Sequence, residues 1–236
     1  MQASIHTLFL TAQYFHYTCA MENIDQPYRK NPLLRLSYNL IAPLYDILIS
    51  RPLLDARIQS LRAMPSDVAG KVLLSGVGTG LDLPLLPAIH RYTALDFNAA
   101  MLARAIKRSE RLRSSGKIRE VDWVLGDSMA LPFADAQFDH VVLHLILAVV
   151  PQPVQCLSEA ARVLKPGGTI LVLDKFLHPH QPALLRRALN PLSRRLATRL
   201  DVVFEEVLSG VPQLQVSSDV PLLAGGWFRS IVLRNR

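Results

Sequence analysis

The sequence predicts an α/β fold: a doubly wound, mostly parallel sheet of seven strands with an N-terminal helical cap. From residue 71 onward, short apolar runs alternate with amphipathic segments, which is typical of a parallel sheet covered by helices. The first run, 72–74, leads directly into a turn with glycine at positions 76, 78 and 80. A chain of 236 residues, 50% of them hydrophobic, is long enough for one large core and too apolar for disorder.

We expect residues 1–32 to form an N-terminal extension and residues 33–236 to form a single domain. Residues 1–20 are too short and too polar for a transmembrane helix and a poor signal peptide. Either the native start is Met21 and these residues are a surplus extension, or they form a flexible or interfacial arm. Leucines and isoleucines spaced three and four apart predict the helical cap over residues 33–65, broken by Pro43 and Pro52.

The core, residues 70–175, contains the next elements in order. Apolar runs predict five strands, over residues 72–74, 92–95, 121–125, 138–143 and 169–174. Helical spacing predicts helices over 98–113 and 154–164, the second ended by Lys165-Pro166-Gly167-Gly168. Residues 176–236 are expected to hold C-terminal helices, one over 202–208, and closing strands at 214–216 and 227–233. Right-handed crossovers place the ends of the first and fourth strands at a topological switch point, where such sheets bind ligands.

The glycine turn indicates a ligand that touches bare backbone at a helix N-terminus. Asp96 closes the second apolar run, where an acidic side chain accepts hydrogen bonds from two ribose hydroxyls. The spacing is G-x-G-x-G, not the dinucleotide G-x-G-x-x-G, and no Lys-Ser or Lys-Thr follows as in a P-loop. A cofactor that contains a nucleoside is therefore expected, and a glycine turn without a ligand is the alternative.

Four segments resemble class I S-adenosylmethionine-dependent methyltransferases and follow in the order of that family: residues 74–80, 94–98 with 101–102, 126–133 with 138–139, and 161–168. Residues 42–46, 76–84 and 147–153 are also similar to bacterial phosphatidylethanolamine N-methyltransferases. The ubiquinone/menaquinone methyltransferase group shares the four core segments. The resemblance implies that the cofactor is S-adenosyl-L-methionine.

The resemblance also implies which residues bind the cofactor. Gly76 and Gly78 would admit its methionyl part, Asp96 would hold the ribose, and Asp127 would accept a hydrogen bond from the adenine amino group. The remaining members of the implied set are Ser75, Phe97, Ser128 and Met129, of which the last two would flank the base. A sulfonium cation without phosphate suits a site lined by carboxylates and not by lysines.

One position departs from the family. Leu74 stands two residues before the first glycine, where the family usually has Glu or Asp to orient the methionyl end. Three outcomes are open: cofactor binding is weaker, Ser75 or Asp82 compensates, or methyl transfer is altered or lost. Asp139 begins a strand, away from the ligand end of the sheet, and is expected to be structural.

Methyl transfer to an amine requires the amine to lose a proton, so a nearby base would help. His144, at the exit of the fourth strand, is the first candidate, and Tyr45 of the cap is the second. Packing in the core is the alternative for both side chains. His178 and His180 have no further ligand in the pattern, so no metal site is expected.

The acceptor is predicted to be a lipid head-group amine or another apolar small molecule, because residues 143–150 at the strand exit are almost wholly apolar. Residues 181–200 combine leucines with five arginines and no acid, which suits peripheral binding to an anionic membrane; an ordinary surface helix is the alternative. The two distant cysteines and the formal charge of +7 fit a cytoplasmic protein at the inner membrane surface.

Two other functions are compatible with the sequence. One is methylation of a quinone precursor or another small molecule, and the other is cofactor binding without methyl transfer. A nucleic-acid substrate is not expected, because residues 145–148 lack the Asn/Asp-Pro-Pro-aromatic tetrapeptide of amino-directed DNA methyltransferases. The sequence leaves the oligomeric state open.

Overall fold

The computed structural model describes residues 53–118, 120–177, 201–223 and 225–236. Its strands are β1 (Lys71–Ser75), β2 (Arg91–Asp96), β3 (Val121–Leu125), β4 (Phe138–His144), β5 (Leu164–Lys175), β6 (Leu214–Pro221) and β7 (Phe228–Asn235). Its helices are helix 53–61, η2 (Leu83–Leu85), α3 (Ala99–Ser114), α4 (Pro153–Val163) and α6 (Phe204–Ser209).

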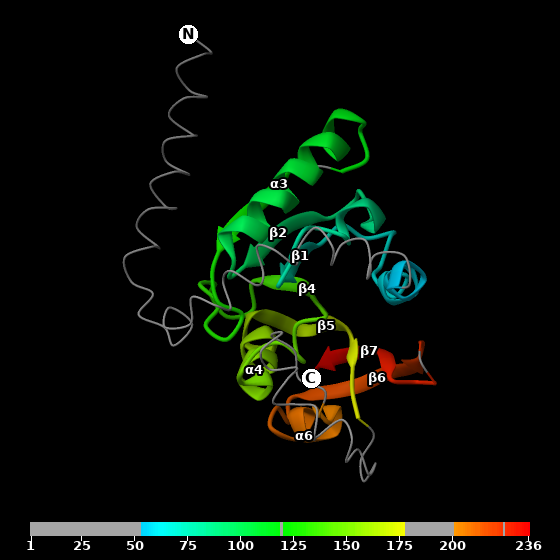
Figure 1. Cartoon of the computed structure of the whole chain (residues 1–236). Helices are drawn as coiled ribbons and strands as arrows, with labels where there is room; N and C mark the ends of the chain where they lie inside the picture. The colour runs from blue at the N-terminus through cyan, green and yellow to red at the C-terminus, as the bar shows by residue number, and fades with distance from the viewer. Residues whose placement is uncertain (1–52, 119, 178–200, 224) are drawn as a thin grey trace.

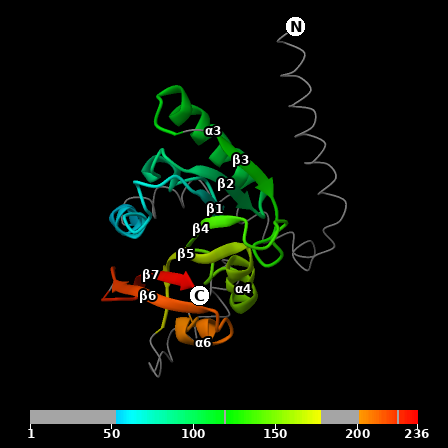
Figure 2. The same ribbon diagram turned by 180° about the vertical axis from the view of Figure 1, so that it is seen from behind.

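The strands form one seven-stranded sheet in the order β3-β2-β1-β4-β5-β7-β6 (Figure 1). The first five strands run parallel, and β7 runs antiparallel between β5 and β6. Figure 2 shows the sheet from behind, with β3 beside β2 and β6 at the opposite side. The predicted doubly wound, mostly parallel sheet is confirmed.

The sheet is buried on both faces, which explains the continuous apolar runs of its central strands. Leu73 of β1 packs into one cluster with Leu157 of α4, and this cluster also includes side chains of α6. Leu74 packs into a second cluster with Leu102 of α3 and Leu61 of helix 53–61. Successive side chains of a strand point to opposite faces, so these clusters place α4 and α6 on one face and α3 with helix 53–61 on the other.

Local signals define the ends of the two longer helices. The Asn98 side chain caps α3 by accepting hydrogen bonds from the backbone N–H groups of Ala100 and Met101 at 2.9 and 3.3 Å. Pro153 occupies the first turn of α4, where its missing N–H leaves no partner unsatisfied.

Two predicted boundaries were wrong. Residues 165–168 do not form a turn between helix and strand, because β5 begins at Leu164, which pairs with Phe138. The next pair is His140 with Thr169, so the two glycines make an irregularity within the strand, where Gly167 has a φ of +73°. β6 extends beyond the predicted 214–216 to Pro221, because backbone pairing with β7 maintains a strand whose side chains are mostly exposed.

Several predicted segments lie outside the described residues: the extension over 1–32, most of the cap with Tyr45, and the basic stretch over 181–200. In the described part of the chain, no helix has the length and apolar character needed to cross a membrane.

Candidate functional site

The predicted site residues meet where the parallel strands end. Ser75 and Asp96 are the last residues of β1 and β2, and His144 is the last residue of β4. Asp127 follows β3, one residue after Gly126, whose N–H donates to the Asp96 carbonyl at 3.0 Å. Because β1, β2, β3 and β4 are neighbours in the sheet, their carboxyl ends form one edge.

The glycine turn after β1 leaves backbone open on one side and packs closely on the other. Gly76 and Gly78 have φ angles of +75° and +57°, which other residues rarely adopt. A Cβ at Gly76 would lie 2.2 Å from Ile146, whereas a Cβ at Gly78 would meet nothing within 4 Å. Gly80 serves packing, because a Cβ there would lie 3.1 Å from Ala105 of α3. Gly78 is therefore the position at which a ligand has room to contact the backbone.

Asp96 connects the glycine turn to the start of α3. Its Oδ2 accepts a hydrogen bond from the Gly78 N–H at 2.7 Å, and its Oδ1 accepts one from the Asn98 N–H at 2.8 Å. Burial raises the pKa of Asp96, and the backbone N–H groups counteract that rise. A carboxylate has about four acceptor sites, and the backbone N–H groups of Asn98, Gly78 and Phe97 leave at least one of them for a ligand hydroxyl.

The segment after β3 brings the next predicted residues together. Oδ1 of Asp127 accepts a hydrogen bond from the Met129 N–H at 2.8 Å. The Ser75 hydroxyl donates to the Ser128 hydroxyl at 2.8 Å, and both side chains are buried. Met129 turns its side chain into the larger core cluster, while Phe97, next to Asp96, is 43% exposed. Six of the predicted residues (Ser75, Gly76, Gly78, Asp96, Asp127 and Ser128) thus line one continuous edge.

Leu74 lies in the apolar core and carries no polar function. Of the two residues expected to compensate for it, Ser75 is engaged with Ser128, and Asp82 is engaged in a buried network. Oδ1 of Asp82 accepts hydrogen bonds from Arg57 at 2.6 Å and from Nδ1 of His144 at 3.1 Å. Burial raises the pKa of Asp82, but the interactions with the His144 imidazole and the Arg57 guanidinium outweigh that rise and hold the pKa well below its usual range. Asp82 is therefore ionised at neutral pH.

His144 has a partner on each ring nitrogen. An ionised Asp82 accepts hydrogen bonds only, so Nδ1 of His144 carries a proton. Nε2 lies 3.1 Å from the hydroxyl of Ser60, which belongs to helix 53–61. Both side chains are buried, so the imidazole is fixed between the glycine turn, β4 and this helix.

The chain leaves β4 through a strained residue. Leu145 has a φ of +59°, and its N–H donates to the Leu173 carbonyl at 2.7 Å. The buried carboxylate of Asp174 accepts from the Ala148 N–H at 3.0 Å and fixes the following loop. Burial raises the pKa of Asp174. Backbone strain of this kind, on the order of 1–3 kcal/mol, is concentrated at functional sites.

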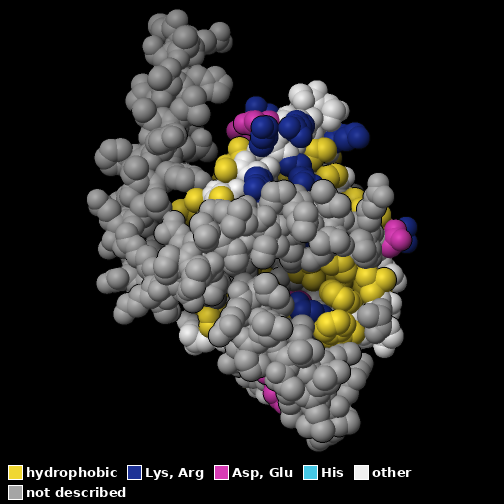
Figure 3. Space-filling model, in the orientation of Figure 1, with side chains coloured by type: hydrophobic (Ala, Val, Ile, Leu, Met, Phe, Trp, Pro, Cys, Tyr) yellow, Lys and Arg dark blue, Asp and Glu magenta, His cyan; other side chains and the backbone are white. Residues whose placement is uncertain are grey.

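Apolar side chains gather beside this exit, and we call them the exit cluster. Leu53, Ala56 and Leu173 are buried in it, and Leu145, Leu222, Leu223 and Phe228 pack against it while partly exposed. They come from helix 53–61, the residue after β4, β5 and the β6–β7 hairpin. Figure 3 shows apolar side chains gathered on this face of the molecule, with a basic side chain beside them.

Sequence reasoning missed the partners that hold the site. Arg57 and Ser60 lie on helix 53–61, three residues apart, which is helical spacing, but nothing local links them to Asp82 or His144. Asp139 lies at the opposite edge of the sheet, where it accepts from the Lys71 N–H and pairs with Lys165, as expected of a structural residue. No group of three or more metal-ligating side chains occurs within the described ranges.

Comparisons with known proteins agree with this geometry. A family described as "Methyltransferase domain" matches residues 73–172. A phosphatidylethanolamine N-methyltransferase from Cereibacter sphaeroides is 35% identical over 170 residues, which cover 71% of this chain and 81% of that protein. A ubiquinone/menaquinone biosynthesis C-methyltransferase from a Ruegeria species is 38% identical over 152 residues, 58% of this chain and 56% of that protein.

A solved structure shares the fold. Geranyl diphosphate C-methyltransferase from Streptomyces coelicolor, in complex with Mg²⁺, geranyl diphosphate and S-adenosyl-L-homocysteine, superposes with a TM-score of 0.61 at 17% identity. The superposition covers 79% of this chain and 81% of that one.

Proposed function

Because this chain belongs to the class I S-adenosylmethionine-dependent methyltransferases, we propose that it methylates a lipid head-group amine or another apolar small molecule. The family follows from 35% identity across 81% of a phosphatidylethanolamine N-methyltransferase. The chain is thus a methyltransferase, and S-adenosyl-L-methionine is its cofactor.

The residues at the strand ends fit this cofactor. Gly78 has space for a ligand against its backbone, and Asp96 and Asp127 offer carboxylate oxygens for hydroxyl and amino groups. When bound, the cofactor supplies a methyl group activated by a sulfonium sulfur. We assign Gly76 and Gly78 to its methionyl part, Asp96 to its ribose and Asp127 to its base, with Ser75, Phe97, Ser128 and Met129 around them.

The observation that supports an apolar acceptor is the exit cluster. It adjoins Leu145, the residue after His144, and its partly exposed members offer an apolar surface at the same sheet edge as Gly78 and Asp96. Lys175, two residues beyond Leu173 on the same strand face, is half-buried and opposite Phe228 in register. An apolar wall with a lysine at its border suits an amphiphile that carries a phosphate. The relatedness to the phosphatidylethanolamine enzyme supports the same class.

His144 is the proposed base. Asp82 holds its Nδ1 proton, which leaves Nε2 as the basic atom. The Ser60 hydroxyl is bound there in this structure, so the acceptor amine would pass its proton to Nε2 through that hydroxyl or in place of it. Tyr45 remains the second candidate and lies outside the described residues.

The test is transfer of a radiolabelled methyl group from the cofactor into vesicles that contain phosphatidylethanolamine. Parallel reactions contain a demethylated quinone precursor or RNA. Label is expected in the phospholipid, and its amine should carry the new methyl group by mass spectrometry. Asp96→Asn, which impairs the proposed ribose contact, should transfer less label when the cofactor is below saturation.

Label in the quinone precursor alone would replace the lipid assignment by the second candidate, which the 38% identity to a quinone-pathway methyltransferase favours. Peripheral association with an anionic membrane is part of the lipid proposal.

A further inference from the structure

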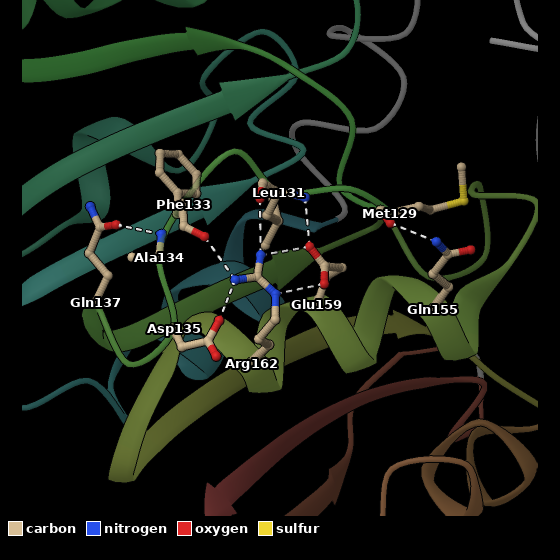
Figure 4. Close-up of polar contacts among 9 residues, drawn as sticks. All are labelled: Met129, Leu131, Phe133, Ala134, Asp135, Gln137, Gln155, Glu159 and Arg162. Carbon is tan, nitrogen blue, oxygen red and sulfur yellow. Dashed lines mark hydrogen bonds and ion pairs between the residues drawn. The ribbon is translucent and has the colours of Figure 1, made fainter.

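One face of α4 holds the segment that follows β3 through hydrogen bonds to its backbone (Figure 4). Gln155, Glu159 and Arg162 occupy positions i, i+4 and i+7 of the helix, so their side chains project from the same face. We call these three side chains the α4 anchor. They reach residues 129, 131 and 133, which lie 26 to 31 positions earlier in the chain.

Arg162 uses all five of its N–H donors. Nε and one Nη2 hydrogen bind the two oxygens of Glu159, both at 2.8 Å. The other Nη2 hydrogen binds the Leu131 carbonyl at 3.0 Å, and Nη1 binds the Phe133 carbonyl at 2.8 Å and Asp135 at 2.7 Å. Pairing with Glu159 and then Asp135 raises the pKa of Arg162, so its charge is permanent. The planar guanidinium fixes two carbonyls at once, which an ammonium group does not reproduce.

The other two side chains complete the anchor. Glu159 accepts a hydrogen bond from the Leu131 N–H at 2.8 Å, and Gln155 donates to the Met129 carbonyl at 2.9 Å. Met129 and Leu131 also bury their side chains in the larger core cluster. The backbone from 129 to 133 is therefore fixed at every second residue, both by polar contacts and by packing.

This fixation extends to the proposed base-binding residue. The Met129 N–H donates to Oδ1 of Asp127, while the Met129 carbonyl accepts from Gln155. A displacement of Met129 would therefore change the direction in which the Asp127 carboxylate points. Ser128, between them, is tied to Ser75 at the end of β1. Asp127 thus stands between two fixed points, one on α4 and one on β1.

We propose that Arg162, with Glu159 and Gln155, is a positioning residue that lets this enzyme distinguish adenine from a base without the amino group. The inference rests on the assignment of Asp127 to the cofactor's base. Arg162 itself would not touch the cofactor, since its five donors are used in holding the segment. A misplaced Asp127 would lose its hydrogen bond to the amino group, and other contacts with the cofactor would remain.

Two ligands test this: S-adenosylhomocysteine and S-inosylhomocysteine, which has oxygen in place of the adenine amino group. The parent should bind the first more tightly in calorimetry. Arg162→Lys keeps the positive charge but not the planar guanidinium. It should weaken the binding of S-adenosylhomocysteine by a factor on the order of ten, the equivalent of one hydrogen bond. The affinity for S-inosylhomocysteine should change far less. The dissociation constant of S-inosylhomocysteine divided by that of S-adenosylhomocysteine should therefore fall toward one.

Arg229→Lys is the matched control. Arg229 of β7 also pairs with two carboxylates, Glu205 and Asp219, but it lies on the other side of the sheet centre from β3. The Arg229→Lys substitution should lower the melting temperature and leave the ratio of the two dissociation constants unchanged. Gln155→Ala, at an exposed position, should lower the ratio in the same direction as Arg162→Lys, and its melting temperature should stay close to that of the parent.

An unchanged ratio in both Arg162→Lys and Gln155→Ala would reduce the anchor to a structural role and overturn the proposal. Equal affinity of the parent for the two ligands would overturn the proposal as well, because Asp127 would then make no hydrogen bond to the adenine amino group. None of these measurements contains an acceptor, so a failure of the lipid proposal leaves their outcome unaffected.

Discussion

Asp96 joins the glycine turn to α3, and we propose that its remaining acceptor capacity binds the ribose of the cofactor. An amide has a single acceptor oxygen, and its NH₂ group would face a backbone N–H. Asp96→Asn is therefore expected to reduce the affinity for S-adenosylhomocysteine, measured by calorimetry, at least about tenfold, because charge-assisted hydrogen bonds to the ribose are lost. The fold should persist, since burial of the charge raises the pKa of Asp96 and a neutral side chain avoids that cost. Asp122→Asn, an exposed carboxylate of β3, should not change the affinity.

The Arg57–Asp82 pair is a second test at the scale of residues. Both side chains are buried, so removal of one leaves an uncompensated charge in the core. Arg57→Met should reduce the free energy of unfolding by about 3 kcal/mol in urea titrations. The double variant with Asp82→Leu should lose less than the sum of the single variants, whereas strict additivity would contradict the coupling. Arg62→Met, an exposed neighbour, should stay within about 0.5 kcal/mol of the parent.

At the scale of elements, local patterns were sufficient for β1 to β4 and for α3. The signals are a continuous apolar run, the glycine turn and the Asn98 cap, and each lies within a few residues of the element that it defines. The irregularity in β5 was not predictable in this way, because it depends on the pairing of Leu164 with Phe138. β6 was underestimated because backbone pairing, and no apolar alternation, maintains it.

The same distinction applies to the site. Asp96 and Asp127 stand at strand ends that periodicity locates. Arg57 with Asp82 and Arg162 with Leu131 are contacts between residues 25 and 31 positions apart, for which a single sequence has no local signal. Polar residues at 155, 159 and 162 would have been assigned to a solvent-facing stripe of an amphipathic helix.

His140, near the edge at which the parallel strands begin, predicts that the stability of the fold depends on pH. His140 of β4 contacts the Thr169 hydroxyl at 2.7 Å and lies edge-on to His90. Burial lowers the pKa of His140, and His90 and Lys165 lower it further, against the opposing effect of Asp139. The unfolded chain therefore binds a proton first as the pH falls below 6.5, and stability is lost from there down to the folded pKa. The urea concentration at the midpoint of unfolding should decrease when the pH is lowered from about 7.5 to about 5.5. The decrease should be smaller in His140→Gln. An equal loss in both proteins would assign the effect to other groups.

The whole molecule is basic, with a formal charge of +7, and the charge is unevenly distributed. α3 carries five basic residues and one acidic residue, and Figure 3 shows basic side chains along it. If the acceptor is a lipid, this charge would assist association with an anionic membrane, at about 1 kcal/mol for each engaged arginine.

Flotation with anionic vesicles tests the membrane proposal. The parent should float at low salt and dissociate at high salt, because salt screens the attraction. The variant in which Arg186, Arg187, Arg194 and Arg195 become Gln should float poorly. A matched variant neutralises four residues of α3 (Arg104, Lys107, Arg111 and Arg113) and separates the effect of total charge from that of the segment. A parent that fails to float would favour a soluble acceptor, and equal flotation of all three would exclude an electrostatic mechanism.

The position of β7 has a consequence for how the chain is made. β7 follows β6 in the chain, yet it lies between β5 and β6, and β6 pairs with no other described strand. During synthesis, β5 and then β6 leave the ribosome ahead of β7, so the edge of β5 and the edge of β6 both stay bare until β7 has emerged. Unpaired strand edges promote association between chains. Nascent chains on crowded ribosomes are therefore most vulnerable to aggregation just before residues 228–235 emerge, and a chaperone would be needed most at that point.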